Sequence, residues 1–138
     1  MERSPAERPN PKSTEPAVVV QRAFDFSLWL IRNVEKFPRS FRFSVGDRVI
    51  ARSLDLLETL TEAAYTANKG PLLERANRLL NALRLLVRLT VELDLLGADS
   101  HEFASKNLEE IGRMIGGWMK AAQRRQPREA QNLPRSPQ

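Results

Sequence analysis

Residues 36–49 read KFPRSFRFSVGDRV, and this stretch separates the first two helical segments of the chain. The first segment must end near Phe37, because the residue before a proline is pushed out of the α-helical region. Ser44 is the expected N-cap of the next helix, and Asp47 follows three residues later, where a carboxylate favours the helix N-terminus. We therefore expect a tight corner in which one helix stops and the next begins.

Apolar residues recur at helical spacing on either side of this corner, and they predict four long helices and no strands. The first helix covers about residues 17–35, and the second runs from the corner to about Ala64. Short connections between such helices predict an all-α fold, an up-down-up-down antiparallel four-helix bundle over residues 17–123. The proline-rich ends, residues 1–16 and 124–138, are expected to be disordered tails, and the second tail is basic.

Glycine, proline and capping residues mark the ends of the third and fourth helices. Gly70-Pro71 closes the second helix and opens the third, which is expected to stop at Gly97. Asp99 is the expected N-cap of the fourth helix, and Glu102 completes a capping-box pattern. Junctions this short fold successive helices back against one another.

The third helix is apolar around nearly its whole circumference. Its large apolar residues are Leu79, Leu80, Leu83, Leu85, Leu86, Val87, Leu89, Val91, Leu93, Leu95 and Leu96. A helix that is apolar all round is buried on all sides, whereas a single four-helix bundle exposes the outside of every helix. We therefore predict a homo-oligomer in which another subunit covers the remaining face.

The composition excludes several classes of protein. The chain of 138 residues has no cysteine, which excludes a disulfide scaffold and a thiolate metal site. No apolar run approaches the roughly 20 residues of a membrane span, so we expect a soluble, cytoplasmic protein with no membrane partner. The net charge of +5 at pH 7 is concentrated in residues 124–138 and around residues 36–52. A basic patch of this kind favours polyanions such as RNA or DNA.

The sequence contains no catalytic constellation. The single histidine, His101, is expected to be an exposed residue in the first turn of the fourth helix, and the acidic residues are dispersed. The glycine-rich residues 112–117, GRMIGG, lack the preceding strand and the Lys-Ser/Thr ending of a phosphate loop. We therefore expect that the protein is not an enzyme and holds no cofactor and no metal.

The glycines of the fourth helix still require an explanation, because a glycine inside a helix costs about 1 kcal/mol relative to alanine. Gly112 and Gly116 are four residues apart and share one face. They are expected to let another backbone or a large ring, such as Trp118 of a neighbouring helix or subunit, come close. The alternative is a frayed helix end.

Two groups of basic residues are candidates for binding nucleic acid. The first group, the basic corner, comprises Lys36, Arg39, Arg42, Arg48 and Arg52. The second is the pair Arg84 and Arg88, one turn apart on the third helix. Their guanidinium groups would form bidentate hydrogen bonds to phosphates. The alternatives are solvated arginines around phenylalanines that plug the bundle end, and an ion pair between Arg88 and Glu92. Stacking of Phe41 or Phe43 on bases competes with simple packing.

Three stretches of the chain carry a family resemblance. They are the KFPRSFRFSVGDRV corner, the segment LLERANRLLNALRLLVRLT and the closing EIGRMIGGWMK. Over about residues 18–122 the chain resembles the accessory variability determinant proteins of diversity-generating retroelements. These four-helix-bundle proteins are related to the bundle proteins encoded in intervening sequences of bacterial 23S ribosomal RNA genes.

The resemblance implies a function that composition does not reveal. It implies a homopentameric, basic barrel that binds nucleic acid, associates with the retroelement reverse transcriptase and supports error-prone synthesis of complementary DNA from template RNA. The basic corner and the pair Arg84 and Arg88 are the positions that match the basic surface of the family. The alternative is a protein of the intervening-sequence type, an oligomeric structural or interaction module without a polymerase partner.

Overall fold

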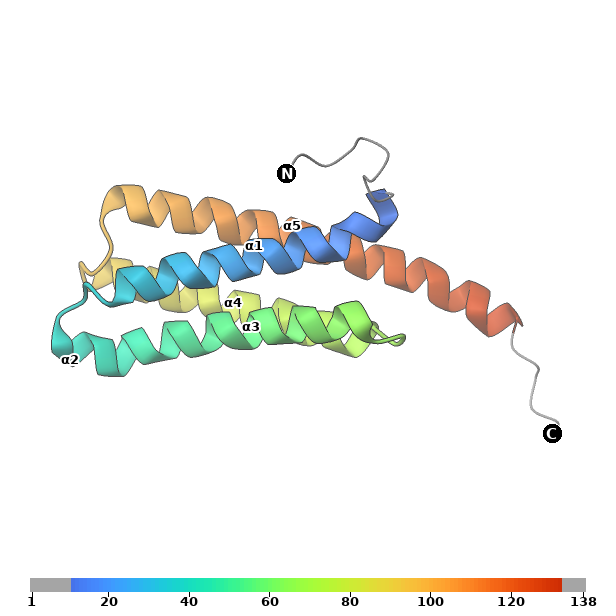
Figure 1. Ribbon diagram of the computed structural model, residues 1–138, viewed down its shortest axis with the longest axis horizontal. Helices are drawn as coiled ribbons and strands as arrows, with labels where there is room; N and C mark the ends of the chain where they lie inside the picture. The colour runs from blue at the N-terminus through green and yellow to red at the C-terminus, as the bar shows by residue number, and fades with distance from the viewer. Residues whose placement is uncertain (1–10, 133–138) are drawn as a thin grey trace, which may run out of the picture.

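The computed structural model describes the backbone of residues 11–132 and the side chains of residues 16–124. Over this range the chain is helical, with short connections and no strand. The elements are α1 (Pro11–Val34), the short α2 (Arg39–Phe41), a π-helical turn (Arg42–Gly46), α3 (Asp47–Tyr65), α4 (Gly70–Glu92) and α5 (Ala98–Asn132). Successive long helices run in opposite directions (Figure 1), which confirms the predicted four-helix bundle.

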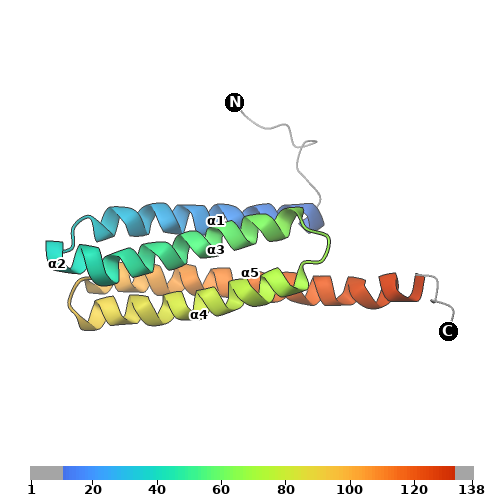
Figure 2. The same cartoon turned by 90° about the horizontal axis from the view of Figure 1, so that it is seen from below.

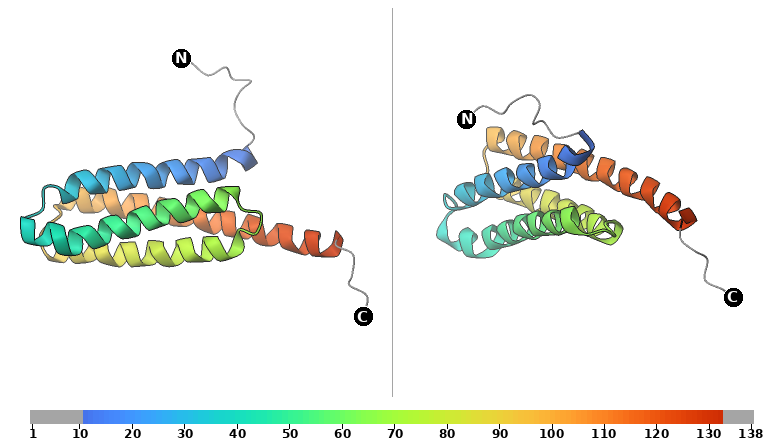
Figure 3. Two further views of the ribbon diagram at one scale, coloured as in Figure 1. Left: turned by 60° about the horizontal axis from the view of Figure 1, so that its bottom comes forward. Right: turned by 45° about the vertical axis from the view of Figure 1, so that its right-hand side comes forward.

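The four long helices form a ring in which each has two neighbours. α1 packs against α3 and α5, and α4 packs against the same two helices. α1 and α4 therefore lie diagonally across the bundle, as do α3 and α5 (Figure 2). The first half of α5 lies beside the other helices, whereas its second half extends beyond them (Figure 3).

Each long helix contributes one apolar seam to a shared core. The largest fully buried side chains are Phe26, Leu30, Leu56, Leu60, Leu73, Leu80, Leu83, Leu108, Ile111 and Ile115. Burying one side chain of this kind stabilises a fold by about 1.5–3 kcal/mol. These residues recur at intervals of three, four or seven within their helices, so the helical period of the sequence directly positions the core.

One chain alone does not cover α4 on all sides. Leu83 and Val87 are buried, whereas Leu85 is 67% exposed and Leu89 and Leu93 are also exposed. The exposed leucines are four residues apart and so share one outward face. The apolar circumference of this helix thus divides into a core face and a solvent face, and the homo-oligomer stays a prediction.

The corner between α1 and α3 differs from its prediction. The helix resumes at Arg39, directly after Pro38, so Ser44 does not act as an N-cap. The Ser44 hydroxyl instead donates a 3.0 Å hydrogen bond to the Ser40 carbonyl inside the helix. Pro38 has φ −52°, which suits the entry to a helix, and α2 then passes through the π-helical turn directly into α3.

Gly46 lets the end of α1 come close to the π-helical turn. A Cβ atom at this position would lie 2.8 Å from Cγ1 of Val34 and 3.0 Å from the carbonyl oxygen of Phe41. Real Cβ atoms do not tolerate such a distance without a shift of the neighbouring atoms. The corner therefore requires glycine at residue 46.

Lys69 satisfies the carbonyl groups at the end of α3. This helix ends at Tyr65, and Lys69 Nζ donates hydrogen bonds of 2.8 Å to the Ala63 carbonyl and 2.9 Å to the Thr66 carbonyl. A cation at a helix C-terminus also interacts favourably with the helix dipole. α4 begins at Gly70 with Pro71 in its first turn, which confirms the predicted start, but Gly70 does not close α3, because α3 already ends at Tyr65.

The predicted stop of the third helix at Gly97 is wrong, because α4 ends at Glu92. Asp94 adopts a left-handed backbone conformation with φ 57°, which aspartate tolerates better than most residues. The Leu95 amide then donates to the Thr90 carbonyl at 2.9 Å, which closes a Schellman-type helix end.

The predicted capping box of α5 does not form. α5 begins at Ala98, and the Gly97 carbonyl accepts the first backbone hydrogen bond, from His101, at 2.9 Å. Asp99 lies in the first turn, where its carboxylate favours the helix N-terminus. Glu102 pairs with Lys106 at 3.1 Å instead of reaching back to the cap.

Both terminal helices extend beyond the predicted limits of the bundle. α1 begins at Pro11 rather than Ala17, and α5 continues to Asn132 rather than ending near Gln123. Residues 1–10 and 133–138 lie outside the described part of the chain, and the disorder of the two tails stays a prediction. Among the described helices, none is both long enough and apolar enough to cross a membrane.

A pair of buried serines lies between α1 and α3. The Ser27 hydroxyl donates to the Ala23 carbonyl at 2.9 Å and lies 2.7 Å from the Ser53 hydroxyl. Both residues are buried. Buried hydroxyls with partners cost little, whereas a buried hydroxyl left without one costs about 1–3 kcal/mol.

Replacing one serine should therefore destabilise the fold more than replacing both. We expect Ser27→Ala to lower the free energy of unfolding by about 1–3 kcal/mol, because it leaves the Ser53 hydroxyl buried without its partner. The double variant Ser27→Ala/Ser53→Ala should recover part of this loss. Urea denaturation followed by circular dichroism measures wild type and both variants, and a larger loss in the double variant than in Ser27→Ala would contradict the interpretation.

A second prediction compares two glycines that lie in different surroundings. Gly46→Ala should lower the free energy of unfolding by about 1–3 kcal/mol, because the new methyl group meets Val34 and the Phe41 carbonyl. Gly117→Ala is the matched control, since a Cβ there meets nothing within 4 Å and alanine favours the helix by about 1 kcal/mol. Opposite signs are expected by urea denaturation, and equal effects would rule out the close approach at Gly46.

Candidate nucleic-acid interface

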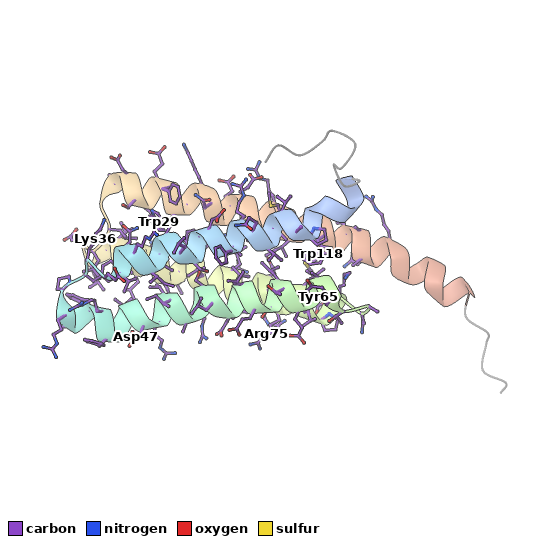
Figure 4. All side chains as sticks on the ribbon, viewed as in Figure 1. Trp29, Lys36, Asp47, Tyr65, Arg75 and Trp118 are labelled. Atoms are coloured by element: carbon purple, nitrogen blue, oxygen red, sulfur yellow. The ribbon has the colours of Figure 1, made fainter. Side chains whose placement is uncertain are left out.

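The basic corner lies at one end of the bundle, where α1 ends and α3 begins (Figure 4). Lys36, Arg39 and Arg48 are exposed, and Arg42 and Arg52 are half-buried. All five side chains come from the short segment between the end of α1 and the second turn of α3. The structure therefore brings the predicted corner residues together.

One of these five cations is already neutralised by a carboxylate on the same helix. Arg52 donates to Asp55 at 3.2 Å, three residues further along α3. Of the described side chains, no carboxylate lies within 4 Å of the nitrogens of Lys36, Arg39, Arg42 or Arg48. Four cations of the basic corner thus remain available to an anionic ligand.

The three phenylalanines of the corner have three different environments. Phe37 is 4% exposed and belongs to the core, and Phe41 is half-buried against it. Phe43 is 68% exposed. The expectation that the phenylalanines close the bundle end therefore holds for Phe37 and Phe41 but not for Phe43.

Arg42 is held beside the exposed ring. Its guanidinium carbon lies 5.8 Å from the centroid of Phe43, within the range of a cation–π contact. Its Nε atom is buried and has no hydrogen-bond partner among the described residues. A buried donor normally has a partner, so the unpartnered Nε–H group is an exception among the described residues.

A groove of about 550 Å³ runs between α4 and α5 and contains the second predicted pair. Arg84 and Arg88 line it from α4, and His101 and Ser105 line it from α5. The remaining lining residues are Val87, Val91, Glu92, Leu108 and Glu109. Because α4 runs toward the end of the bundle that holds the basic corner (Figure 1), the groove and the corner share that end.

Arg84 is fixed across the groove by its neighbours on α4 and α5. Its Nη2 atom donates to the Leu108 carbonyl at 3.3 Å, and its Nη1 atom donates to Asn81 Oδ1 at 3.4 Å. A Cβ atom at Gly112 would lie 2.5 Å from Nη2 of Arg84. Gly112 therefore makes room for a guanidinium group rather than for the backbone or large ring that was expected.

The other predicted glycine contact is not seen. A Cβ atom at Gly116 or Gly117 would meet no described atom within 4 Å. Trp118 is buried within its own chain, with Lys69 Nζ 5.6 Å from its ring centroid. The Gly116 prediction is therefore wrong for contacts within one chain.

The ion pair between Arg88 and Glu92 does not form within 4 Å, although both side chains lie along the same groove. Arg88 is exposed and is free to approach a ligand. His101 and Ser105 face the same space and were not predicted as site residues. Their spacing of four on α5 places them on one face, but only the packing of α5 against α4 brings that face to the arginines.

The described residues contain no group of three or more His, Cys, Asp or Glu side chains that could hold a metal ion. The arrangement instead offers guanidinium and ammonium groups around one exposed ring and along one groove. Groups of this kind bind phosphates and other anions. The assignment of individual corner and groove residues to nucleic acid stays a prediction.

The helices and their connections define an all-α, up-down-up-down bundle with a cationic corner and an arginine-lined groove at one end. A family model described as bAvd-like matches residues 17–122, and the chain belongs to this family. The match confirms the resemblance to accessory variability determinant proteins, so the chain is an accessory protein of this type. No curated protein and no solved structure matches the chain.

Proposed function

We propose that this protein is a non-catalytic accessory factor of a diversity-generating retroelement. It binds template RNA and its complementary DNA, associates with the reverse transcriptase and supports mutagenic synthesis of complementary DNA in the cytoplasm. Membership of the bAvd-like family supports the accessory role. The observation that supports nucleic-acid binding is the placement of the four corner cations and the Arg84 groove at one end of the bundle.

Local charge, rather than overall charge, makes this end a polyanion site. The net charge of the whole chain is only +5, and part of it lies in the C-terminal segment. Four cations within one corner nevertheless attract phosphates over distances of about one Debye length, about 8 Å at physiological salt. One copy then supplies few phosphate contacts, and an oligomer multiplies them.

The exposed apolar residues support an oligomer with a particular geometry. Leu85 and Leu89 face outward from α4, and Phe24 and Leu28 face outward from α1. Each pair has a spacing of four, and the two helices lie diagonally across the bundle. An isologous contact covers only one of these faces, whereas a head-to-tail contact between α1 of one copy and α4 of the next covers both, and it forms a ring when the rotation between copies closes. The family resemblance makes the ring a pentamer.

The nucleic-acid proposal is tested by the salt dependence of RNA binding. Binding of a labelled RNA by the full chain should weaken steeply as salt rises from about 50 to 200 mM, because counterions are released from the phosphates. Arg84→Ala/Arg88→Ala should weaken binding at every salt concentration. It should also reduce the slope of log K against log salt by about 0.7 for each single-strand phosphate that the variant no longer neutralises.

Arg75→Ala/Arg78→Ala is the matched control for this experiment. It removes the same charge from exposed positions of the same helix, outside the residues that line the groove. A similar loss in both double variants would mean that only the total charge matters. An absence of RNA binding at low salt would overturn the proposal and favour a structural module of the intervening-sequence type.

The oligomer is tested by placing carboxylates in the outward leucine face of α4. Wild-type protein at micromolar concentration should sediment as an oligomer, and Leu85→Glu/Leu89→Glu should sediment as a folded monomer, because burying unpaired carboxylates is costly. Leu54→Glu on α3, another exposed leucine, is the control and should leave the oligomer intact. A wild-type monomer in sedimentation velocity would contradict the proposal.

A further inference from the structure

Phe43 is an exposed ring in the middle of the basic corner, within the π-helical turn. Val45 and Gly46 of the same turn are buried, and Phe41 packs half-buried against the core, whereas Phe43 is turned away from it. π-Helical turns are uncommon and occur frequently at functional sites. The π-helical turn therefore buries Val45 and Gly46 and exposes the Phe43 ring to solvent.

One cation lies beside this ring, and two more exposed cations come from the adjoining turns. The Arg42 guanidinium lies 5.8 Å from the ring centroid, and its buried Nε atom lacks a partner among the described residues. Arg39 precedes Phe43 by one turn and Arg48 follows it in the first turn of α3, and both are exposed. Neither has a carboxylate within 4 Å in the described part of the chain.

We infer that Phe43 is a stacking platform for an unpaired base, and that Arg39, Arg42 and Arg48 hold the phosphates on either side of that base. The ligand class is single-stranded RNA or DNA. This inference rests on the proposed nucleic-acid function and specifies which form of nucleic acid the corner takes. The combination of an aromatic ring with a cationic track is the arrangement by which proteins bind single strands without reading their sequence.

A duplex does not offer the contact that Phe43 requires. Bases inside a duplex are stacked on both faces, so a ring on the protein surface reaches only the backbone and groove edges. An unpaired base presents a free face and stacks on phenylalanine whatever its identity. Phe43 should therefore contribute to single-strand binding and not to duplex binding.

The surroundings of Phe43 distinguish it from a subunit contact. The cores of protein–protein interfaces are depleted in charged residues, whereas Phe43 stands among arginines that have no carboxylate partner within the described part of the chain. The apolar faces assigned to the oligomer lie on the outer sides of α1 and α4, with Phe24 and Leu85 as their most exposed members. A polyanion that carries flat rings fits the corner better than an apolar protein surface.

Binding of single and double strands by variants of the full chain tests this inference. Fluorescence anisotropy measures the affinity for a labelled mixed-sequence single strand and for a blunt duplex of the same sequence, both at low salt. Phe43→Ala should weaken single-strand binding by about 5- to 150-fold, the range that loss of one base stack produces. Phe43→Leu should weaken it similarly, because leucine is apolar but has no π-face.

Two further variants keep the result interpretable. Phe43→Trp retains a flat ring, and it should restore single-strand affinity to within about threefold of wild type. Tyr65→Ala removes an exposed aromatic residue at the opposite end of the bundle (Figure 4) and should change neither affinity. Circular dichroism and sedimentation of each variant establish that the fold and the oligomeric state are unchanged.

Each outcome separates this inference from the proposed function. Unchanged single-strand affinity in Phe43→Ala, with salt-dependent binding intact, overturns the stacking role alone. An equal loss for single strand and duplex also overturns it, because Phe43 then acts through the shape of the corner. Wild-type protein that binds neither form overturns both proposals. Loss of reverse-transcriptase association with unchanged single-strand affinity assigns Phe43 to a protein contact and likewise overturns the inference.

Discussion

The close approach of α1 to the π-helical turn at Gly46 is the constraint on which the basic corner depends. Because Gly46 has no side chain, the Val34 side chain fills the space beside it. The turn can then bury Val45 and pass directly into α3. The other side of the turn consequently carries the exposed Phe43 and, beside it, the half-buried Arg42. The burial of Val45 and Gly46 on one side of the π-helical turn thus leaves Phe43 exposed on the other side.

The helices were predictable from the sequence, but their ends were less so. Apolar periodicity depends on the whole seam of each helix, so a single residue hardly alters it. A helix end depends on competition between a few neighbouring groups. Pro38 restarts the helix before Ser44 can cap it, and Asp94 ends α4 before Gly97 is reached. Serine and glycine are common at helix ends. Here the helix had already started after Pro38, before Ser44. Likewise, α4 had already ended at Glu92, before Gly97.

The basic residues of the site could be found by composition, but their partners could not. Arg52 with Asp55 and Arg88 with Glu92 both have spacings that allow ion pairs, and only the first pair forms. Gly112 indicated a close contact, yet the group that approaches it, the Arg84 guanidinium, comes from a different helix. Contacts between helices depend on rotation and register, which the spacing along one helix does not determine.

The anchoring of Arg84 bears on the free-energy cost of the proposed anion binding. Its guanidinium is already held by the Leu108 carbonyl and by the space above Gly112, so a bound anion does not have to immobilise this side chain. Immobilising a flexible side chain costs about 0.5–1.5 kcal/mol. Both arginines are exposed, but Arg84 has hydrogen-bond partners on α4 and α5, so for the proposed ligand this cost falls mainly on Arg88. The two arginines are therefore unequal. For the proposed anion ligand, Arg84 is thus the preorganised contact, and Arg88 is the contact that binding has to order.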